Sequence, residues 1–472
     1  MASSRKYRKR FILSGNNRRN LNGGIYDMKI TWKQSAKCAS LLTAAAMLAA
    51  CGSGGNKASP GTSTPSSPGD ASKAAVVDMS KPITFTFFNN ASNEIFEQEI
   101  GARIKAKYPN VTIKTVGNGF TRSNMEKLLA AGEQIDLFWI GFQESIADMK
   151  ELGLAMDLSE LIKRDKYDLS RFDDSALQMV KDQSDKGEIF ALPWQVGSAV
   201  LFYNTDLFNK FGVPYPKDGM TWSETIDLAK KVTRNDNGVQ YRGLDIGLVR
   251  HFYQQYALSP FDPKTGKATY LSDPRWNRIM QFVKDLYSIP GNRPEKIAED
   301  RAGFMQQKVV AMLPWSAYFQ PFLGAADLNF NIAALPVFDD AKGQGVSPAA
   351  SILMMNPKTK VKEEGWEILK FLASDEVEIG NSRIGFPPAI KLQAAKDQFG
   401  ADLPGVEKLN MKAVFYNKFT AQPVIKGEYH SAAIKPYVPM IQNVGNDKSD
   451  INTALRDAQE AADKAIQELQ SR

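Results

Sequence analysis

Side chains that could catalyse a reaction are scarce in this sequence. It holds two histidines, His251 and His430, and two cysteines, Cys38 and Cys51. The Gly-x-Ser-x-Gly turn of serine hydrolases, the His-Glu-x-x-His and Cys-x-x-Cys motifs of zinc sites and the Gly-x-x-x-x-Gly-Lys loop of ATPases are all missing. Residues 235–238 (NDNG) lack the spaced Asp and the final Glu of a calcium loop and predict a turn instead. We therefore expect no cofactor and no metal.

The basic residues that give the chain its formal charge of +7 cluster at the N-terminus. Residues 1–50 hold ten of the 59 lysines and arginines but only one of the 52 acidic residues, so the rest of the chain is slightly acidic. A charge confined to a leader does not create the basic face that a nucleic-acid-binding domain needs. We expect no nucleic-acid partner.

Residues 28–51 have the three parts of a secretory signal. A cationic stretch from Met28 precedes an apolar run that is shorter than the ~20 residues of a permanent membrane span. The run ends in Leu48-Ala49-Ala50-Cys51, which resembles the bacterial lipobox, where the cysteine sulfur receives a lipid before cleavage. The sequence predicts a leader and signal peptide at 1–50, with Met28 as the true start, and a lipidated Cys51.

Residues 51–78 are rich in Gly, Ser, Pro and Thr and show no apolar periodicity. Such a segment buries too little surface to fold, so it predicts a disordered tether. Cys38 leaves with the signal, and the mature chain then holds no free thiol, which suits an oxidising exterior. The expected location is the outer face of the cell membrane, or the periplasm, with the protein held by a lipid anchor.

From residue 83 onward, strand and helix patterns alternate. Strands are predicted at 83–88, 111–116 and 135–140, and helices at 94–107 and 123–131 lie between them. This alternation indicates an α/β layer with a mainly parallel sheet. Ligands of such sheets sit beyond the carboxyl ends of the strands, and that rule places Asn89 and Trp139 near a crevice.

The next segments follow a recognisable order. A Leu-Pro pair at 192–193 is followed by a strand ending in Tyr203-Asn204, by Gly-Val-Pro at 212–214 and by Thr-Trp-Ser-Glu at 221–224, which opens a helix. This order resembles the extracellular solute-binding proteins of ATP-driven importers, the group that includes the maltose-binding protein. Segments at 302–318, 330–336, 351–373, 384–388 and 451–469 extend the likeness to the end of the chain.

The resemblance implies an α/β fold of the periplasmic-binding-protein type (class II), in which two lobes close on a ligand about a hinge. We expect lobe 1 to comprise residues 79–193 plus 328–375, and lobe 2 to comprise 194–327 plus 376–472.

A sugar ring presents apolar C–H faces and a rim of hydroxyls, so a carbohydrate site needs aromatic platforms and polar partners. Together with the resemblance, this selects aromatic residues at strand ends and loops, and polar residues near them. The candidate substrate-binding residues are Asn89, Trp139, Gln143, Trp194, His251, Tyr253, Trp315, Tyr318 and Phe386. We expect Trp222, Trp276 and Trp366 to be packing residues, because they lie within or at the start of helical patterns.

The predicted function is a lipid-anchored receptor that captures a carbohydrate, an oligosaccharide in our interpretation, and delivers it to the permease subunits of an ABC transporter. We expect a monomer without enzymatic activity. The sequence leaves one alternative open, a glycoside hydrolase that uses two carboxylates, because spacing along the chain does not reveal their separation in space. It does not identify the sugar, its length or its linkage, and a structural surface lipoprotein also fits the signal.

Overall fold

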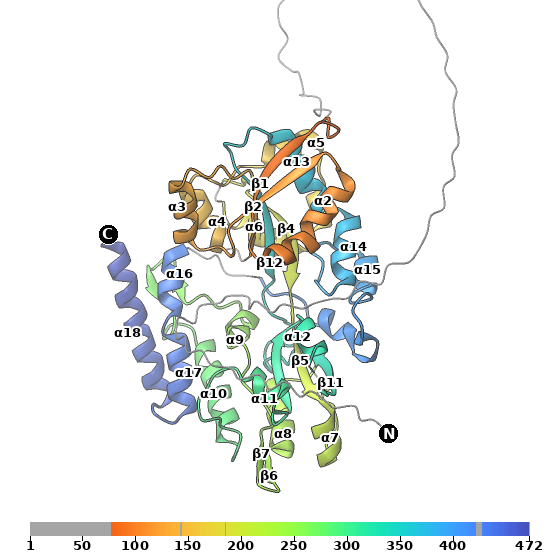
Figure 1. Cartoon of the computed structure of the whole chain (residues 1–472). Coiled ribbons are helices and arrows are strands. Elements are labelled where there is room, and N and C mark those ends of the chain that lie inside the picture. The colour runs from red at the N-terminus through yellow and green to blue at the C-terminus, as the bar shows by residue number, and fades with distance from the viewer. Residues whose placement is uncertain (1–76, 142–143, 185, 326, 422–426, 472) are drawn as a thin grey trace, which may run out of the picture. The chain divides into compact units, whose positions relative to one another are not determined.

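The computed structural model describes residues 77–141, 144–184, 186–325, 327–421 and 427–471 (Figure 1). The predicted signal, the predicted lipidation site Cys51, almost all of the predicted tether and the candidate Gln143 lie outside these residues. No helix in the described ranges is both long enough and apolar enough to cross a membrane.

The first part of the fold is a five-stranded sheet in the order β2-β1-β3-β12-β4. Its strands are β1 (Ile83–Phe88), β2 (Val111–Val116), β3 (Leu137–Gly141), β4 (Leu192–Gly197) and β12 (Ala349–Met355). β1 runs parallel to β2 and β3, whereas β12 is antiparallel to both β3 and β4. The parallel arrangement predicted from the first three strands is thus confirmed.

Helices of the first lobe pack on this sheet and share one apolar core with it. These elements are α1 (Asn93–Phe96), η1 (Glu97–Gly101), α2 (Ala102–Lys107), α3 (Arg122–Ala130), α4 (Glu144–Glu151), α5 (Ser159–Asp165), η2 (Leu169–Arg171), α6 (Asp174–Lys181), α13 (Lys362–Leu372) and α14 (Asp375–Arg383). The helix predicted at 94–107 forms as one run, α1-η1-α2, with a π-helical turn in its middle.

The second lobe is built on a three-stranded antiparallel sheet of β10 (Met312–Ser316), β5 (Ala199–Asn204) and β11 (Phe330–Ala334), with β5 in the centre. Alternate residues of β5 enter two different cores: Leu201 packs in one and Phe202 in the other. Because both faces of the sheet are covered, β5 is apolar along nearly its whole length instead of alternating with polar residues.

The remaining elements belong to the second lobe, except α15 (Gln393–Asp397), which packs against α14 of the first lobe. They are α7 (Thr205–Phe211), α8 (Trp222–Val232), β6 (Arg234–Asp236), β7 (Val239–Tyr241), α9 (Arg250–Gln255), β8 (Phe261–Asp262), β9 (Lys267–Ala268), α10 (Arg275–Ser288), α11 (Arg301–Met305), α12 (Gln320–Leu323), α15 (Gln393–Asp397), η3 (Val406–Lys408), η4 (Met411–Phe415), α16 (Gly427–Ile434), α17 (Tyr437–Gly445) and α18 (Ile451–Gln470). Figure 1 shows α18 running beside α16 and α17, and its apolar face packs on both.

Several local predictions are confirmed. Thr221 caps α8 in a capping box: its Oγ1 accepts a hydrogen bond from Glu224 N, and its backbone N donates to Glu224 Oε2. The 235–238 segment is the turn of the β6–β7 hairpin, where Asn235 Oδ1 accepts a hydrogen bond from Gly238 N at 3.2 Å. The three tryptophans expected to be packing residues are fully or almost fully buried: Trp222, Trp276 and Trp366.

The predicted lobe boundaries need three corrections. Lobe 2 was expected to begin at residue 194, but β4 keeps residues 194–197 in the first sheet. Residues 328–348 were expected in lobe 1, but β11 pairs with β5, and its alternate side chains complete both faces of the second sheet. Lobe 2 was expected to resume at residue 376, but Val377, Ala389 and Ile390 pack in the first core. A short apolar strand fits either sheet equally well as a sequence pattern, so only its pairing reveals which sheet it joins.

Candidate functional site

The chain passes between the two lobes at three places: after β4, before β12 and after α14. Hydrogen bonds join these crossings to their surroundings. Val196 N donates to Pro387 O at 3.1 Å, and Ala317 N, just after β10, donates to Ser198 O at 2.9 Å. The end of β4, the end of β10 and the segment after α14 therefore meet at one junction.

Two of the predicted aromatic residues meet at this junction. Tyr318 follows β10 in the second lobe, and Phe386 lies on the segment that follows α14; their ring centroids are 6.2 Å apart. Tyr318 is 38% exposed, and Phe386 is half-buried. The pair offers ring surface at the point where the two lobes join.

Trp315 lies three residues before Tyr318 and is the last residue but one of β10. It is half-buried, and the Arg301 guanidinium carbon lies 4.8 Å from the centroid of its indole ring. The guanidinium covers one face of the ring by a cation–π contact. A ligand stacked on Trp315 would therefore use the remaining exposed surface or displace Arg301.

Trp194 and Trp139 face the interior of the first lobe. Trp194 is fully buried, and its indole Nε1 donates to Leu372 O at 3.0 Å. Trp139 packs edge-on against it with ring centroids 5.4 Å apart, is also buried, and its Nε1 has no hydrogen-bond partner among the described residues. Trp194 is thus a core residue in this structure and presents no surface to a ligand.

The polar candidates have local partners. Asn89 is fully buried directly after β1, where its Oδ1 accepts from Ala91 N at 2.9 Å and its Nδ2 donates to Asn93 Oδ1 at 3.3 Å. These bonds shape the turn into α1. Gln143 lies outside the described residues.

His251 and Tyr253 lie on α9 in the second lobe. His251 is buried, and burial, assisted by the nearby charge of Arg250, holds the pKa of its imidazole well below the ordinary value. Tyr253 packs against the second core with its ring 5.3 Å from that of Tyr437. The structure places these two candidates in the packing of the lobe, whereas Tyr318 and Phe386 are brought together.

Two buried polar residues at the junction were missed by the sequence analysis. Gln195, on β4, donates from Nε2 to Glu99 Oε2 at 3.0 Å, and both side chains are buried. Glu99 lies in the π turn η1, three residues after Phe96. The sequence did offer one signal for Glu99. It falls on the same face of the helix as the apolar residues Phe96, Ile100 and Ile104, and that face is buried.

Burial raises the pKa of Glu99 to about 7, against the hydrogen bond from Gln195 and the charge of Arg103, which both lower it. The pKa of the Tyr318 phenol in the second lobe is also raised. Burial is the larger cause, and the charge of Glu99 is the second.

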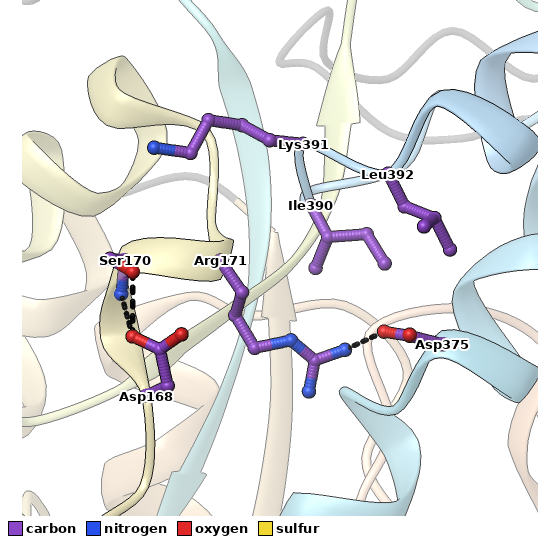
Figure 2. A pocket seen from close by; sticks show the side chains of 7 residues that line it. All are labelled: Asp168, Ser170, Arg171, Asp375, Ile390, Lys391 and Leu392. Atoms are coloured by element: carbon purple, nitrogen blue, oxygen red, sulfur yellow. Dashed lines mark hydrogen bonds and ion pairs between the residues drawn. The ribbon is translucent and has the colours of Figure 1, made fainter.

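Figure 2 shows a separate surface pocket of the first lobe, with a volume of about 430 Å³. It is lined by Asp168, Ser170, Arg171, Asp375, Ile390, Lys391 and Leu392. Arg171 points to Asp375 and forms an ion pair with it. Lys391 Nζ lies 2.9 Å from Asp174 Oδ1, so both cationic side chains of the pocket have an acidic partner. None of the predicted site residues lines this pocket. The described part of the chain also holds no group of three His, Cys, Asp or Glu side chains placed to bind a metal.

Two α/β lobes, a chain that crosses between them three times and aromatic rings at the crossing define a two-lobed binding protein. The family model described as bacterial extracellular solute-binding protein matches residues 89–379. The chain belongs to this family, as its sequence predicted.

Individual relatives agree in fold and coverage. The arabinooligosaccharide-binding protein of Bacillus subtilis is 25% identical over 329 residues, which are 65% of this chain and 72% of that protein. A sugar transporter of Rhizobium etli, solved in an open conformation, superposes with a TM-score of 0.67 at 19% identity, over 80% of this chain and 98% of its own. UgpB of Mycobacterium tuberculosis, in complex with glycerophosphocholine, superposes with a TM-score of 0.63 at 15% identity, over 82% of this chain and 99% of its own.

The placement of Trp194 in the core is testable by its effect on stability. Trp194→Phe removes the donor to Leu372 O and leaves that buried carbonyl unpaired, so we expect the free energy of unfolding to fall by about 1–3 kcal/mol. Urea unfolding followed by circular dichroism measures this. Trp315→Phe is the matched control, with a smaller change because no hydrogen bond of that indole is lost to the core. Equal stability of Trp194→Phe and the parent would contradict the assignment.

Proposed function

We propose that this protein captures an oligosaccharide outside the cell and delivers it to the permease subunits of an ABC importer. Membership in the solute-binding family carries the proposal. The relative that binds arabinooligosaccharides supports a carbohydrate as the ligand class. Aromatic rings at the junction, the exposed Tyr318 and the half-buried Phe386 and Trp315, supply the apolar platforms that sugar faces require.

The mechanism follows from the position of these rings. Tyr318 and Trp315 belong to the second lobe, whereas Phe386 lies on a segment that is hydrogen-bonded to the first lobe through Val196. A ligand that touches both sides gains its full set of contacts only when the lobes are closed. Its differential affinity for the closed state then shifts the population toward that state, and the permease reads the closed form.

We further propose that the ligand leaves chemically unchanged. The buried carboxyl groups include Glu99 and Glu378 in the first lobe and Asp245 in the second, and each has its own internal partners. Asp245 Oδ1 accepts from Gly247 N at 2.8 Å, and Glu378 Oε2 accepts from Ala389 N at 3.0 Å. No observation favours an acid–base pair around a glycosidic bond, so the hydrolase alternative becomes an outcome of the test below.

A lipid anchor on Cys51 would hold the protein at the membrane, and a monomer on a tether would be sufficient for delivery. The lipobox-like Leu48-Ala49-Ala50-Cys51 supports the anchor.

A ligand screen tests the function. With arabinotriose, maltotriose and mannobiose, at least one sugar should raise the melting temperature of the protein by several degrees, because ligand binds the folded state only. Glycerophosphocholine is the non-sugar comparison. Reducing ends should not increase during prolonged incubation. New reducing ends would establish a hydrolase, and a shift with glycerophosphocholine alone would replace the carbohydrate by a phosphodiester.

Trp315 is expected to contribute directly to affinity. Trp315→Ala should weaken binding of the sugar that shifts the melting temperature by about tenfold or more, while the far-ultraviolet circular dichroism stays unchanged. Isothermal titration calorimetry measures the Kd. Tyr416→Ala, which removes another exposed ring of the second lobe, is the control. Unchanged affinity would remove Trp315 from the site.

The anchor is tested by labelling cells with a palmitate analogue. The parent protein should carry the label and sediment with membranes, and Cys51→Ser should lose both properties because the acyl acceptor is gone. Label that persists on Cys51→Ser would show that Cys51 is not the lipidation site.

A further inference from the structure

We propose that Glu99 is a specificity-determining residue, whose carboxylate accepts a hydrogen bond from a hydroxyl of the carbohydrate held between the lobes. This inference rests on the proposed function and names a polar contact for that same site. Three observations carry it: the location of Glu99 at the junction, the way its side chain is held, and the irregular helix that positions it.

The location follows from the neighbours of Glu99. Its partner Gln195 is near the end of β4, where the chain leaves the first lobe, and Gln195 also forms a β-bridge with Pro388 on the returning segment. Phe386 on that segment contacts Tyr318 of the second lobe. Glu99 is thus hydrogen-bonded to the end of β4, which bridges to the returning segment, and the Glu99 charge contributes to the raised pKa of the exposed Tyr318.

The side chain is held but not saturated by the one hydrogen bond from Gln195. A carboxylate offers about four acceptor positions, and Gln195 Nε2 fills one of them at 3.0 Å. Burying a carboxyl group is costly unless donors reach its oxygens. If the only role of residue 99 were to accept the hydrogen bond from Gln195, an uncharged side chain would serve at a lower cost. A ligand hydroxyl is a donor of the required kind, and a site that depends on it rejects analogues that lack it.

The helix is irregular at this residue. Glu99 is the central residue of η1, the π turn inserted between α1 and α2, and π turns inside α-helices occur frequently at functional sites. The extra residue in the turn keeps Phe96, Ile100 and Ile104 in the core and still directs Glu99 toward Gln195.

The charged groups around Glu99 define its response to pH. Arg103 lies one turn further along the helix and favours the ionised carboxyl group, and the Glu99 charge contributes to the raised pKa of Tyr318. The charge of Arg103 is itself influenced by Glu376 and Glu378 of α14. Burial outweighs these effects, and the pKa in the unliganded protein is about 7. A donated hydroxyl stabilises the ionised form, so binding lowers this pKa.

The sign of the pH dependence follows from that shift. The stabilisation by ionised Glu99 is fully present above the pKa of the free protein and is lost as the pH falls through the lower pKa of the complex. Affinity should therefore weaken as the pH drops below about 7. Near that pH, binding should also release protons from Glu99.

Calorimetry with arabinotriose, maltotriose and mannobiose tests the assignment. Titrations near pH 6.5 in two buffers of different ionisation enthalpy measure the protons released, and titrations from about pH 5.5 to about pH 8 measure the Kd. We expect proton release and an affinity that rises with pH for the parent protein. Glu99→Gln should abolish both and weaken binding about tenfold or more at pH 8, since the amide is a poorer acceptor. Glu97→Gln, at an exposed position of the same turn, is the matched control and should behave like the parent.

Each result decides between interpretations. Proton release that persists in Glu99→Gln, or a parent protein that binds sugar without releasing protons, would overturn the role of Glu99 and leave the proposed function intact. Tyr318→Phe separates a second explanation: loss of proton release in that variant would assign the effect to a Tyr318–Glu99 contact and overturn the ligand contact. Binding of none of the three sugars, with glycerophosphocholine bound instead, would overturn both the carbohydrate function and the assignment.

Discussion

The structure depends on how the polypeptide passes between two separately packed lobes without leaving buried backbone groups unpaired. The segment that follows α14 solves this by joining the first lobe along its length. Val196 N donates to Pro387 O, Ala389 N donates to Glu378 Oε2, and Ala389 O accepts from Asp173 N at 2.7 Å. Because each of these groups would be costly to bury unpaired, the segment is held to the first lobe. That attachment sets the position of Phe386, and with it the aromatic pair.

The same junction concentrates polar side chains that a simple core would exclude. Glu99 and Gln195 are buried as a hydrogen-bonded pair, and Glu378 is buried under the returning segment. Burial raises the pKa of both carboxyl groups, Glu99 to about 7. Perturbed carboxyl groups gather at functional sites more often than elsewhere, although structural networks perturb them as well. Here Glu378 accepts a hydrogen bond from Ala389 N, and Glu99 accepts one from Gln195 at the end of β4, where the chain leaves the first lobe.

Three tryptophans illustrate how far residue type alone leads. Trp139, Trp194 and Trp315 are all in strands and all suit a sugar platform. Trp194 is covered by α13, whose last carbonyl, that of Leu372, accepts its indole hydrogen bond across 178 residues of sequence. Trp315 lies near the end of β10, where the sheet ends, and the Arg301 guanidinium packs on its ring. The difference depends on which distant helix lies over each ring, and nothing near a tryptophan in sequence encodes that.

The amino-acid sequence by itself determined the order of strands and helices in the first lobe, the family and the turn at 235–238, because these depend on periodicity, caps and turn residues within a few positions. Tertiary structure decided the rest. It assigned β11 to the second sheet, kept residues 377–390 with the first lobe, and moved Asn89, Trp194 and His251 from candidate contacts into the packing. It also revealed Glu99 and Gln195, which are 96 positions apart in the chain and form one pair. The physical reason is that burial and pairing are properties of segments distant in sequence, so they are decided only when the sheets assemble.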